Sequence, residues 1–167
     1  VRPAQDHDLS ALQMIGATGA PLPEESYWWI ASEVAPGVPV SSITGGTDVV
    51  TAFAAASPAD SIWAGEISGA CLGANLRAFD ADGMALTGEL GELVLTTAMP
   101  SMPVAFWNDL GGDRLHDAYF ARYPGVWCHG DWVTITDRGS LIMHGRSDST
   151  LNRQGVRMGS SEVYAAI

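Results

Sequence analysis

Apolar residues at helical spacing open the chain. One apolar side chain at every third position predicts a short helix over Asp8–Ile15. A glycine-containing loop follows and ends at Pro23. Because proline fits the first turn of a helix and two glutamates come next, a second helix is predicted over residues 24–34.

The next stretch has the pattern of a buried strand. V-P-V-S-S-I (Val38–Ile43) predicts that strand, and T-G-G-T-D (Thr44–Asp48) predicts a tight loop at its carboxyl end. In open α/β sheets, ligands bind at the carboxyl ends of the strands. The loop is therefore a first candidate for a binding site.

After about residue 58 the pattern changes to β. The expected elements are strands over 70–79 and 92–97, a short helix over 113–123, a hairpin of 125–136 and 140–144, and a last helix from Ser160 or Ser161. The pattern therefore predicts an α/β part, a β-rich part, and a new element that begins after Asp148.

Composition narrows the function classes. The chain has 167 residues, 47% of them hydrophobic and 16% charged, which favours a folded core over disorder. A net charge of −11 argues against a nucleic-acid or anionic-membrane surface. It does not exclude binding a small molecule such as a nucleotide, which needs only a local set of donors, and the sequence predicts no oligomeric state.

Cysteine usage and the chain ends add two expectations. Two cysteines give no disulfide framework, and no membrane span or signal peptide is seen, so a cytoplasmic protein is expected. The chain starts without Met and stops inside a helix-like pattern, which indicates a piece of something longer.

The T-G-G-T-D loop has the residue types of an anion site. Its two glycines let backbone N–H groups approach a ligand, and Thr47 adds a hydroxyl donor. Asp48 is a hard oxygen ligand of the kind that Mg²⁺ prefers. The alternative is a simple turn in which the two side chains cap nearby backbone groups.

The run W-C-H-G-D-W (Trp127–Trp132) places a cysteine beside a histidine, which suggests a thiol nucleophile with a histidine base. The geometry of a strand argues against this interpretation. Cys128 and His129 are adjacent, so on a strand they point to opposite faces, and Cys128 is interpreted as a packing residue. Asp131 follows a glycine, where a carboxylate accepts either from sugar hydroxyls or from nearby backbone N–H groups. The four histidines have no metal-ligand spacing.

Residues 144–160 hold three of the chain's eight arginines, together with three glycines, in a chain without lysine. Arg146 and Asp148 lie two apart, so in an extended strand they share a face and can pair. A solvated basic loop is one interpretation. The sharper hypothesis is a phosphate-binding segment that is also a swivel between two lobes.

These motifs, taken in order, resemble the adenylate-forming acyl-CoA synthetases, most closely those that activate acetoacetate. The likeness rests on the stretches G-A-T-G-A-P-L-P-E-E, S-I-T-G-G-T-D-V, W-A-G-E-I, G-E-L-G-E-L-V-L, M-P-S-M-P-V-A-F-W-N-D, Y-P-G-V-W-C-H-G-D-W and G-R-S-D-S-T-L-N-R-Q-G-V-R-M-G-S-S-E-V-Y. It covers nearly the whole chain.

The resemblance implies a partial fold and a two-step reaction. The implied parts are the end of an α/β subdomain (1–60), a β-rich subdomain resembling a distorted barrel (61–144), a hinge (145–149) and the start of a small α+β C-terminal domain (150–167). The implied enzyme is an acid–CoA ligase that uses ATP, Mg²⁺ and coenzyme A. It forms an acyl-adenylate and pyrophosphate first, and the CoA thioester and AMP second.

The resemblance also implies roles for single residues. Gly46 and Thr47 would meet the α-phosphate, Asp48 would bind Mg²⁺, Asp131 would hold the ribose, and Arg146 would reach the ribose or phosphate edge. The other implied roles are the adenine-pocket loop (Gly19, Ala20, Pro21), the hinge (Asp148) and contacts to coenzyme A or the nucleotide after rotation (Gly155, Arg157).

Departures from the family pattern qualify these implications. Thr44 and the two glycines after it replace an aromatic residue of many relatives, and Cys128 stands where a basic residue is expected. The family's phosphate loop is expected before residue 1 and its adenylation lysine after residue 167, so the isolated chain is expected to be inactive. Two alternatives remain: a ligase for acetate, propionate or another short acid, or a catalytically dead nucleotide-binding module.

Overall fold

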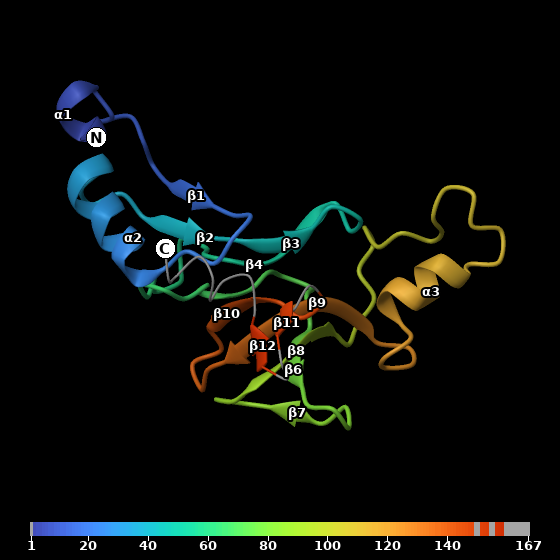
Figure 1. Cartoon of the computed structure of the whole chain (residues 1–167). Coiled ribbons are helices and arrows are strands. Elements are labelled where there is room, and N and C mark those ends of the chain that lie inside the picture. Colours follow the sequence, from blue (N-terminus) through green and yellow to red (C-terminus); the bar gives the residue numbers. More distant parts are fainter. Residues whose placement is uncertain (1, 149–150, 154–155, 159–167) are drawn as a thin grey trace.

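The computed structural model describes residues 2–148, 151–153 and 156–158, and it has a mixed α/β fold. Helices α1 and α2 lie at one end of the molecule and α3 at the other, with the sheets between them (Figure 1). The helices are α1 (Pro3–Asp6), α2 (Glu24–Trp29), which continues as a π-helix η1 (Ile30–Val34), and α3 (Asp113–Tyr119). Within the described residues, no helix combines the length and apolarity that a membrane span requires.

The strands of the described residues form four sheets. A parallel pair consists of β1 (Ile15–Ala17) and β2 (Val40–Ser42), and a three-stranded antiparallel sheet consists of β3 (Thr44–Gly46), β4 (Thr51–Ala55) and β5 (Gly69–Ala70). A five-stranded antiparallel sheet has the order β10 (Leu141–Arg146), β9 (Trp127–Ile135), β8 (Leu90–Leu95), β6 (Leu76–Phe79), β7 (Ala85–Leu86). A last antiparallel pair joins β11 (Leu151–Arg153) to β12 (Val156–Met158).

The helix predicted over Asp8–Ile15 is wrong. The Asp8 carboxylate accepts the Ser10 backbone N–H at 3.1 Å, a local turn that competes with a helical turn. At the other end of this stretch, the Ile15 N–H donates to the Pro39 carbonyl at 2.9 Å and starts strand β1. Tertiary pairing therefore overrides the helical spacing of the apolar residues. The helix predicted over 24–34 is confirmed, and the helix predicted over 113–123 forms but ends at Tyr119.

The tight loop predicted over Thr44–Asp48 is only partly correct. Its first three residues form strand β3, which pairs with β4 through a register shift at Thr44 and Gly45. The two strands approach so closely that a Cβ at Gly45 would collide with the Thr51 carbonyl oxygen. The turn itself begins at Thr47.

The strand predicted over 70–79 divides into two. Gly73 takes a left-handed conformation, φ +85°, in the turn that follows β5, and β6 begins at Leu76. β5 pairs with β4, whereas β6 pairs with β8, so the turn carries the chain from the three-stranded sheet to the five-stranded one. The strand predicted over 92–97 is confirmed as β8.

The predicted C-terminal hairpin is confirmed as β9 and β10. Side chains of β9 alternate between buried and half-buried, and every second residue from Trp127 to Val133 faces inward. The register shifts between Met143 and Gly145, and beyond the shift Arg146 lies opposite Asp131. The bulge thus aims the end of β10 at the inward face of β9.

One hydrophobic core joins the two larger sheets. It combines β4, the segment around residue 67 and the five-stranded sheet; its buried members are Val49, Phe53, Ala54, Ile67, Leu76, Ala78, Leu93, Leu95, Trp127, Val133 and Leu141. Shared burial of this kind fixes the β3–β4 turn relative to strand β9, since moving either one would expose apolar surface. The helix predicted from Ser160 or Ser161 lies outside the described residues.

Candidate functional site

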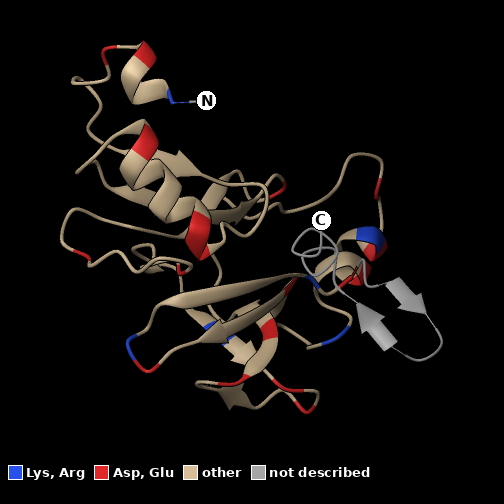
Figure 2. Cartoon of the chain, turned by 60° about the vertical axis from the view of Figure 1, so that its left-hand side comes forward, with Lys and Arg blue, Asp and Glu red and all other residues tan. Residues whose placement is uncertain are grey.

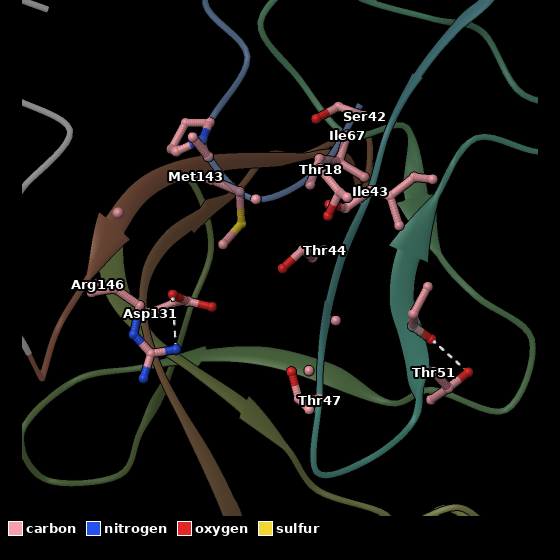
Figure 3. A pocket seen from close by; sticks show the side chains of 17 residues that line it. Thr18, Ser42, Ile43, Thr44, Thr47, Thr51, Ile67, Asp131, Met143 and Arg146 are labelled. Carbon is pink, nitrogen blue, oxygen red and sulfur yellow. Dashed lines mark hydrogen bonds and ion pairs between the residues drawn. The ribbon is translucent and has the colours of Figure 1, made fainter. Parts of the chain in front are cut away.

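A cavity of about 630 Å³ lies where the two larger sheets meet the N-terminal loop. It is lined by Thr18, Gly19, Ala20, Pro21, Ser42, Ile43, Thr44, Gly45, Gly46, Thr47, Thr51, Ala52, Ile67, Asp131, Met143, Gly145 and Arg146. Asp131 and Arg146 lie beside each other in the same space as Thr44 and Thr47 (Figure 3). Segments far apart in the sequence thus converge on one space.

Asp131 is the acidic group of the cavity. It is 8% exposed, and its Oδ1 lies 3.6 Å from Arg146 Nη1. Burial raises the pKa of the Asp131 carboxyl to about 6, an effect that the Arg146 charge opposes and that Asp148 and Glu92 reinforce. Hydroxyl groups of a ligand in the cavity would donate to this carboxylate and stabilise its charged form.

Arg146 joins the cavity to the predicted hinge. Its Nε donates to Asp148 Oδ1 at 2.9 Å, its Nη2 donates to Asp148 Oδ2, and its Nη1 faces Asp131. Gly130 makes this geometry possible, since it has φ +86° and a Cβ there would lie 2.7 Å from Arg146 Nη2. Acidic positions are spread over the molecule and basic ones are few (Figure 2), and among the described residues that line the cavity Arg146 is the one cation.

The predicted anion loop and adenine loop both reach the cavity. Gly46 and Thr47 line it from the start of the β3–β4 turn, and Gly19, Ala20 and Pro21 line it from the loop after β1. The structure thus brings together seven of the site residues that the sequence predicted. Whether they bind a nucleotide stays a prediction.

His129 is a residue that the sequence interpretation missed. Its Nδ1 accepts from the Trp127 indole N–H at 3.3 Å, and its Nε2 then donates to the Gly45 carbonyl at 3.1 Å. Nε2 also lies 3.5 Å from Asp131 Oδ2. Burial lowers the pKa of His129 to about 4, so the ring is neutral at physiological pH and ties strand β3 to strand β9. The signal was present, because residues 129 and 131 share a face on any strand.

Asp48, the predicted Mg²⁺ ligand, lies next to the cavity and does not line it. Its Oδ2 accepts from the Tyr119 hydroxyl at 2.5 Å. Burial, followed by this bond, raises the pKa of Tyr119 to about 12, so the phenol stays protonated as a donor. Among the described residues, no three His, Cys, Asp or Glu groups gather around a common metal position. A single exposed carboxylate fits the way Mg²⁺ is held beside phosphates, with one or two protein ligands.

The remaining predicted residues divide between described and undescribed parts. Arg157 lies on β12, where its backbone pairs with Asn152, and Gly155 lies outside the described residues. Burial raises the pKa of the Cys128 thiol to about 11, which keeps it protonated. This agrees with Cys128 as a packing residue, since the thiolate is the reactive form.

Gly45→Ala is expected to destabilise the protein by about 1–3 kcal/mol, since overpacking against a backbone cannot relax cheaply. The new methyl would collide with the Thr51 carbonyl and lie 2.8 Å from the Cα of Ala52. Denaturant unfolding measures the change. Gly69→Ala is the control on the same sheet, because a Cβ there meets nothing within 4 Å. Equal stability of the two variants would contradict the close β3–β4 approach.

Sequence comparison connects this geometry to known proteins. No protein-family model matches the chain. It is 46% identical over 162 residues to the acetoacetyl-coenzyme A synthetase of Rhizobium meliloti (strain 1021), and 42% identical over 165 residues to the acetoacetyl-CoA synthetase of Xenopus tropicalis. These matches cover 97% and 98% of this chain and 25% of each relative. The chain thus spans about a quarter of the length of the curated relatives it matches.

Solved structures agree. The acetoacetyl-CoA synthetase from Streptomyces lividans matches with a TM-score of 0.87 and 52% identity, over 100% of this chain and 26% of that one. The anthranilate CoA ligase AuaEII, solved in complex with anthranoyl-AMP, matches with a TM-score of 0.77 over 98% of this chain and 30% of that one; at 22% identity it shows the fold alone. This chain is therefore a homologue of one quarter-length segment of the acetoacetyl-CoA synthetases, with the fold of the matching part of an adenylate-forming enzyme.

Proposed function

We propose that this chain supplies the nucleotide-binding face of an ATP-dependent acid–CoA ligase that converts acetoacetate to acetoacetyl-CoA. The observation that carries the proposal is the convergence of the adenine-type loop, the glycine–threonine turn, Asp131 and Arg146 on one cavity. The names of the relatives support the choice of reaction. The chain is a part of that enzyme and is inactive alone.

The first step joins two anions. The acid's carboxylate oxygen attacks the α-phosphorus of ATP, pyrophosphate leaves, and an acyl-adenylate forms. Thr47 donates its hydroxyl to the α-phosphate beside the N–H groups of the Gly46 turn, and Arg146 adds positive charge at the ribose or phosphate edge. Mg²⁺ held by Asp48 would neutralise phosphate charge in this step.

The second step requires a different set of protein groups around the acyl carbon of the adenylate. The coenzyme A sulfur attacks the acyl carbon, the bond to the phosphate oxygen breaks, and AMP leaves. Throughout, Asp131 accepts from the ribose hydroxyls, and Gly19, Ala20 and Pro21 flank the adenine. Asp148 is the pivot of the rotation that separates the two steps. After this rotation, Gly155 and Arg157 reach coenzyme A or the nucleotide.

The proposal includes the division of the chain. Residues 1–60 end an α/β subdomain, 61–144 form the β-rich subdomain, 145–149 form the hinge and 150–167 begin the C-terminal domain. Cys71 and Cys128 are both free thiols, which supports a reducing cytoplasm as the location.

An assay of product identity in the full-length protein tests the reaction class. Acetoacetate, ATP, Mg²⁺ and coenzyme A are supplied, and AMP and pyrophosphate are expected in equal amounts. Release of ADP and phosphate would show a different mechanism. A panel of acetate, propionate and butyrate run in parallel tests the acid, and a higher kcat/KM for any of them would refute acetoacetate.

Nucleotide affinity is expected to rise with pH through the range in which Asp131 ionises. Its pKa in the free site is about 6, so at pH 5 most of the carboxyl is protonated and accepts poorly from ribose hydroxyls. Between pH 5 and pH 7.5, AMP affinity should increase about tenfold from this group alone. His129, with a pKa of about 4, stays neutral over this range.

Calorimetric titration of AMP at several pH values measures the effect. Because the phosphate of AMP also titrates near pH 6, the Asp131→Asn variant provides the baseline, since it keeps the size of the side chain and removes its ionisation. Parallel pH profiles for the two proteins would contradict the ribose assignment.

A further inference from the structure

Glu92 is a buried carboxylate to which the reaction described above assigns no role. It lies on β8 within the run L-G-E-L-V-L and is 0% exposed. Ionised carboxylates are almost never fully buried unless they are paired and hydrogen-bonded. Its surroundings therefore require explanation.

Donors from separate parts of the chain meet this carboxylate, and the Cys128 thiol is also hydrogen-bonded to it. Arg122 Nη1 donates to Oε2, the Gly130 backbone N–H donates to Oε1 at 3.1 Å, and the Ser147 hydroxyl donates to Oε1 at 2.7 Å. The Ser147 backbone N–H also donates to the Gly130 carbonyl at 2.8 Å. A single oxygen, Oε1, thus joins the bend of β9 to the end of β10.

The two residues that share this oxygen adjoin the charged pair of the cavity. Gly130 immediately precedes Asp131, and Ser147 immediately follows Arg146. Neither Gly130 nor Ser147 lines the cavity. Their bonds to Glu92 therefore lie outside the cavity and affect its geometry through the neighbouring residues Asp131 and Arg146. These bonds lie beyond the bulge in β10, where the β9–β10 register shifts between Met143 and Gly145.

We propose that Glu92 is a positioning residue that holds Asp131 and Arg146 in register for the nucleotide, through the Gly130 N–H and the Ser147 hydroxyl. The inference rests on the proposed function. It extends that function by making the strength of ribose recognition depend on a carboxylate outside the cavity. Ser147 lies next to Asp148, so the same bond also fixes the last residue before the pivot.

Substitution at Ser147 tests this without removing the buried charge. Ser147→Ala deletes one bond to Glu92 and leaves its pairs with Arg122 and Gly130 in place. In the full-length protein, the Kd for AMP by calorimetry should rise by up to about tenfold, the factor expected if the whole contribution of one hydrogen bond to a carboxylate serves to hold the cavity pair in place. Ser147→Thr keeps the hydroxyl donor and should restore affinity to within about threefold of wild type.

Thr134→Ala is the matched control. It removes a side-chain hydrogen bond between β9 and β10, the one that joins Thr134 Oγ1 to His144 Nε2 at 3.0 Å, and neither of these residues lines the cavity. The control should bind AMP like wild type, and thermal unfolding shows whether the two alanine variants remain folded. The inference is overturned if Ser147→Ala binds AMP as wild type does, or if the control weakens binding equally.

Acetoacetate-dependent exchange of pyrophosphate into ATP separates this inference from the proposed function. If the wild-type protein binds AMP but shows no exchange, the proposed reaction fails, while the ratio of AMP affinities still decides the role of Glu92. If exchange occurs and the Ser147 variants do not differ from wild type in AMP affinity, the reaction stands and the positioning role is refuted.

Discussion

Asp131→Ala is expected to weaken AMP binding to the full-length protein about a hundredfold. A carboxylate that accepts two ribose hydroxyls contributes about 3 kcal/mol, and each 1.4 kcal/mol corresponds to a factor of ten in affinity. The effect is large because Asp131 is 8% exposed, so water cannot readily replace the lost acceptor. Titration calorimetry with AMP measures it.

Two further measurements make this result specific. 2′,3′-Dideoxy-AMP has no ribose hydroxyls, so it should bind wild type and the Asp131→Ala variant with nearly equal affinity. If the variant lost dideoxy-AMP as severely as AMP, the effect would lie in the Arg146 pairing or in the fold, and the ribose role would be refuted. Arg146 faces Asp131 at 3.6 Å, so this distinction is needed.

Asp148→Pro is expected to reduce thioester formation about a hundredfold while leaving adenylate formation within about threefold of wild type. Proline restricts φ to a narrow range near −65°, so a rotation centred on this residue would meet a stiff backbone. If the stiff backbone raises the free-energy barrier of the rotation by a few kcal/mol, the rate of thioester formation falls by about this factor. Single-turnover assays of the two half-reactions measure it.

The proline variant also deletes a carboxylate, so a second substitution must separate the two effects. Asp148→Ala removes the bonds from Arg146 Nε and Nη2 but leaves φ free. It should release Arg146 and alter nucleotide affinity without a selective loss of the second step. A selective loss of thioester formation in both variants would assign the effect to the Arg146–Asp148 pair and refute the pivot.

Local sequence rules predicted many of the elements. Helix α2, strand β8 and the β9–β10 hairpin follow from proline and glycine signals and from residue periodicity, which act within a few residues. The same rules failed at Asp8–Ile15 and at Thr44–Gly46. In the first place Ile15 pairs with Val40 of β2, a strand distant in the sequence. In the second place Thr44–Gly46 pair with β4, the next strand along the chain, in a hairpin that the sequence analysis did not predict.

The sequence predicted the motifs that contribute the site residues but not the residues that hold those motifs in place. Asp131 and Arg146 were identifiable because each stands in a distinctive run of residues. The roles of Glu92 and His129 were not identifiable, since no residue near them in the sequence indicates that Glu92 bonds to Ser147 or that His129 bonds to Gly45. A carboxylate in the middle of an apolar strand was the available signal for Glu92, and the shared face with Asp131 was the signal for His129.

By itself, the sequence determined the class of the fold, the order of its motifs and the chemical types of the site residues. These properties depend on residue identity and spacing along the chain. Only the tertiary structure decided which side chains meet. The shared core brings β3 against β9, the bulge in β10 turns Arg146 toward Asp131, and burial then shifts the pKa of Asp131. Those effects depend on distances through space between residues tens to a hundred positions apart, which no local pattern encodes.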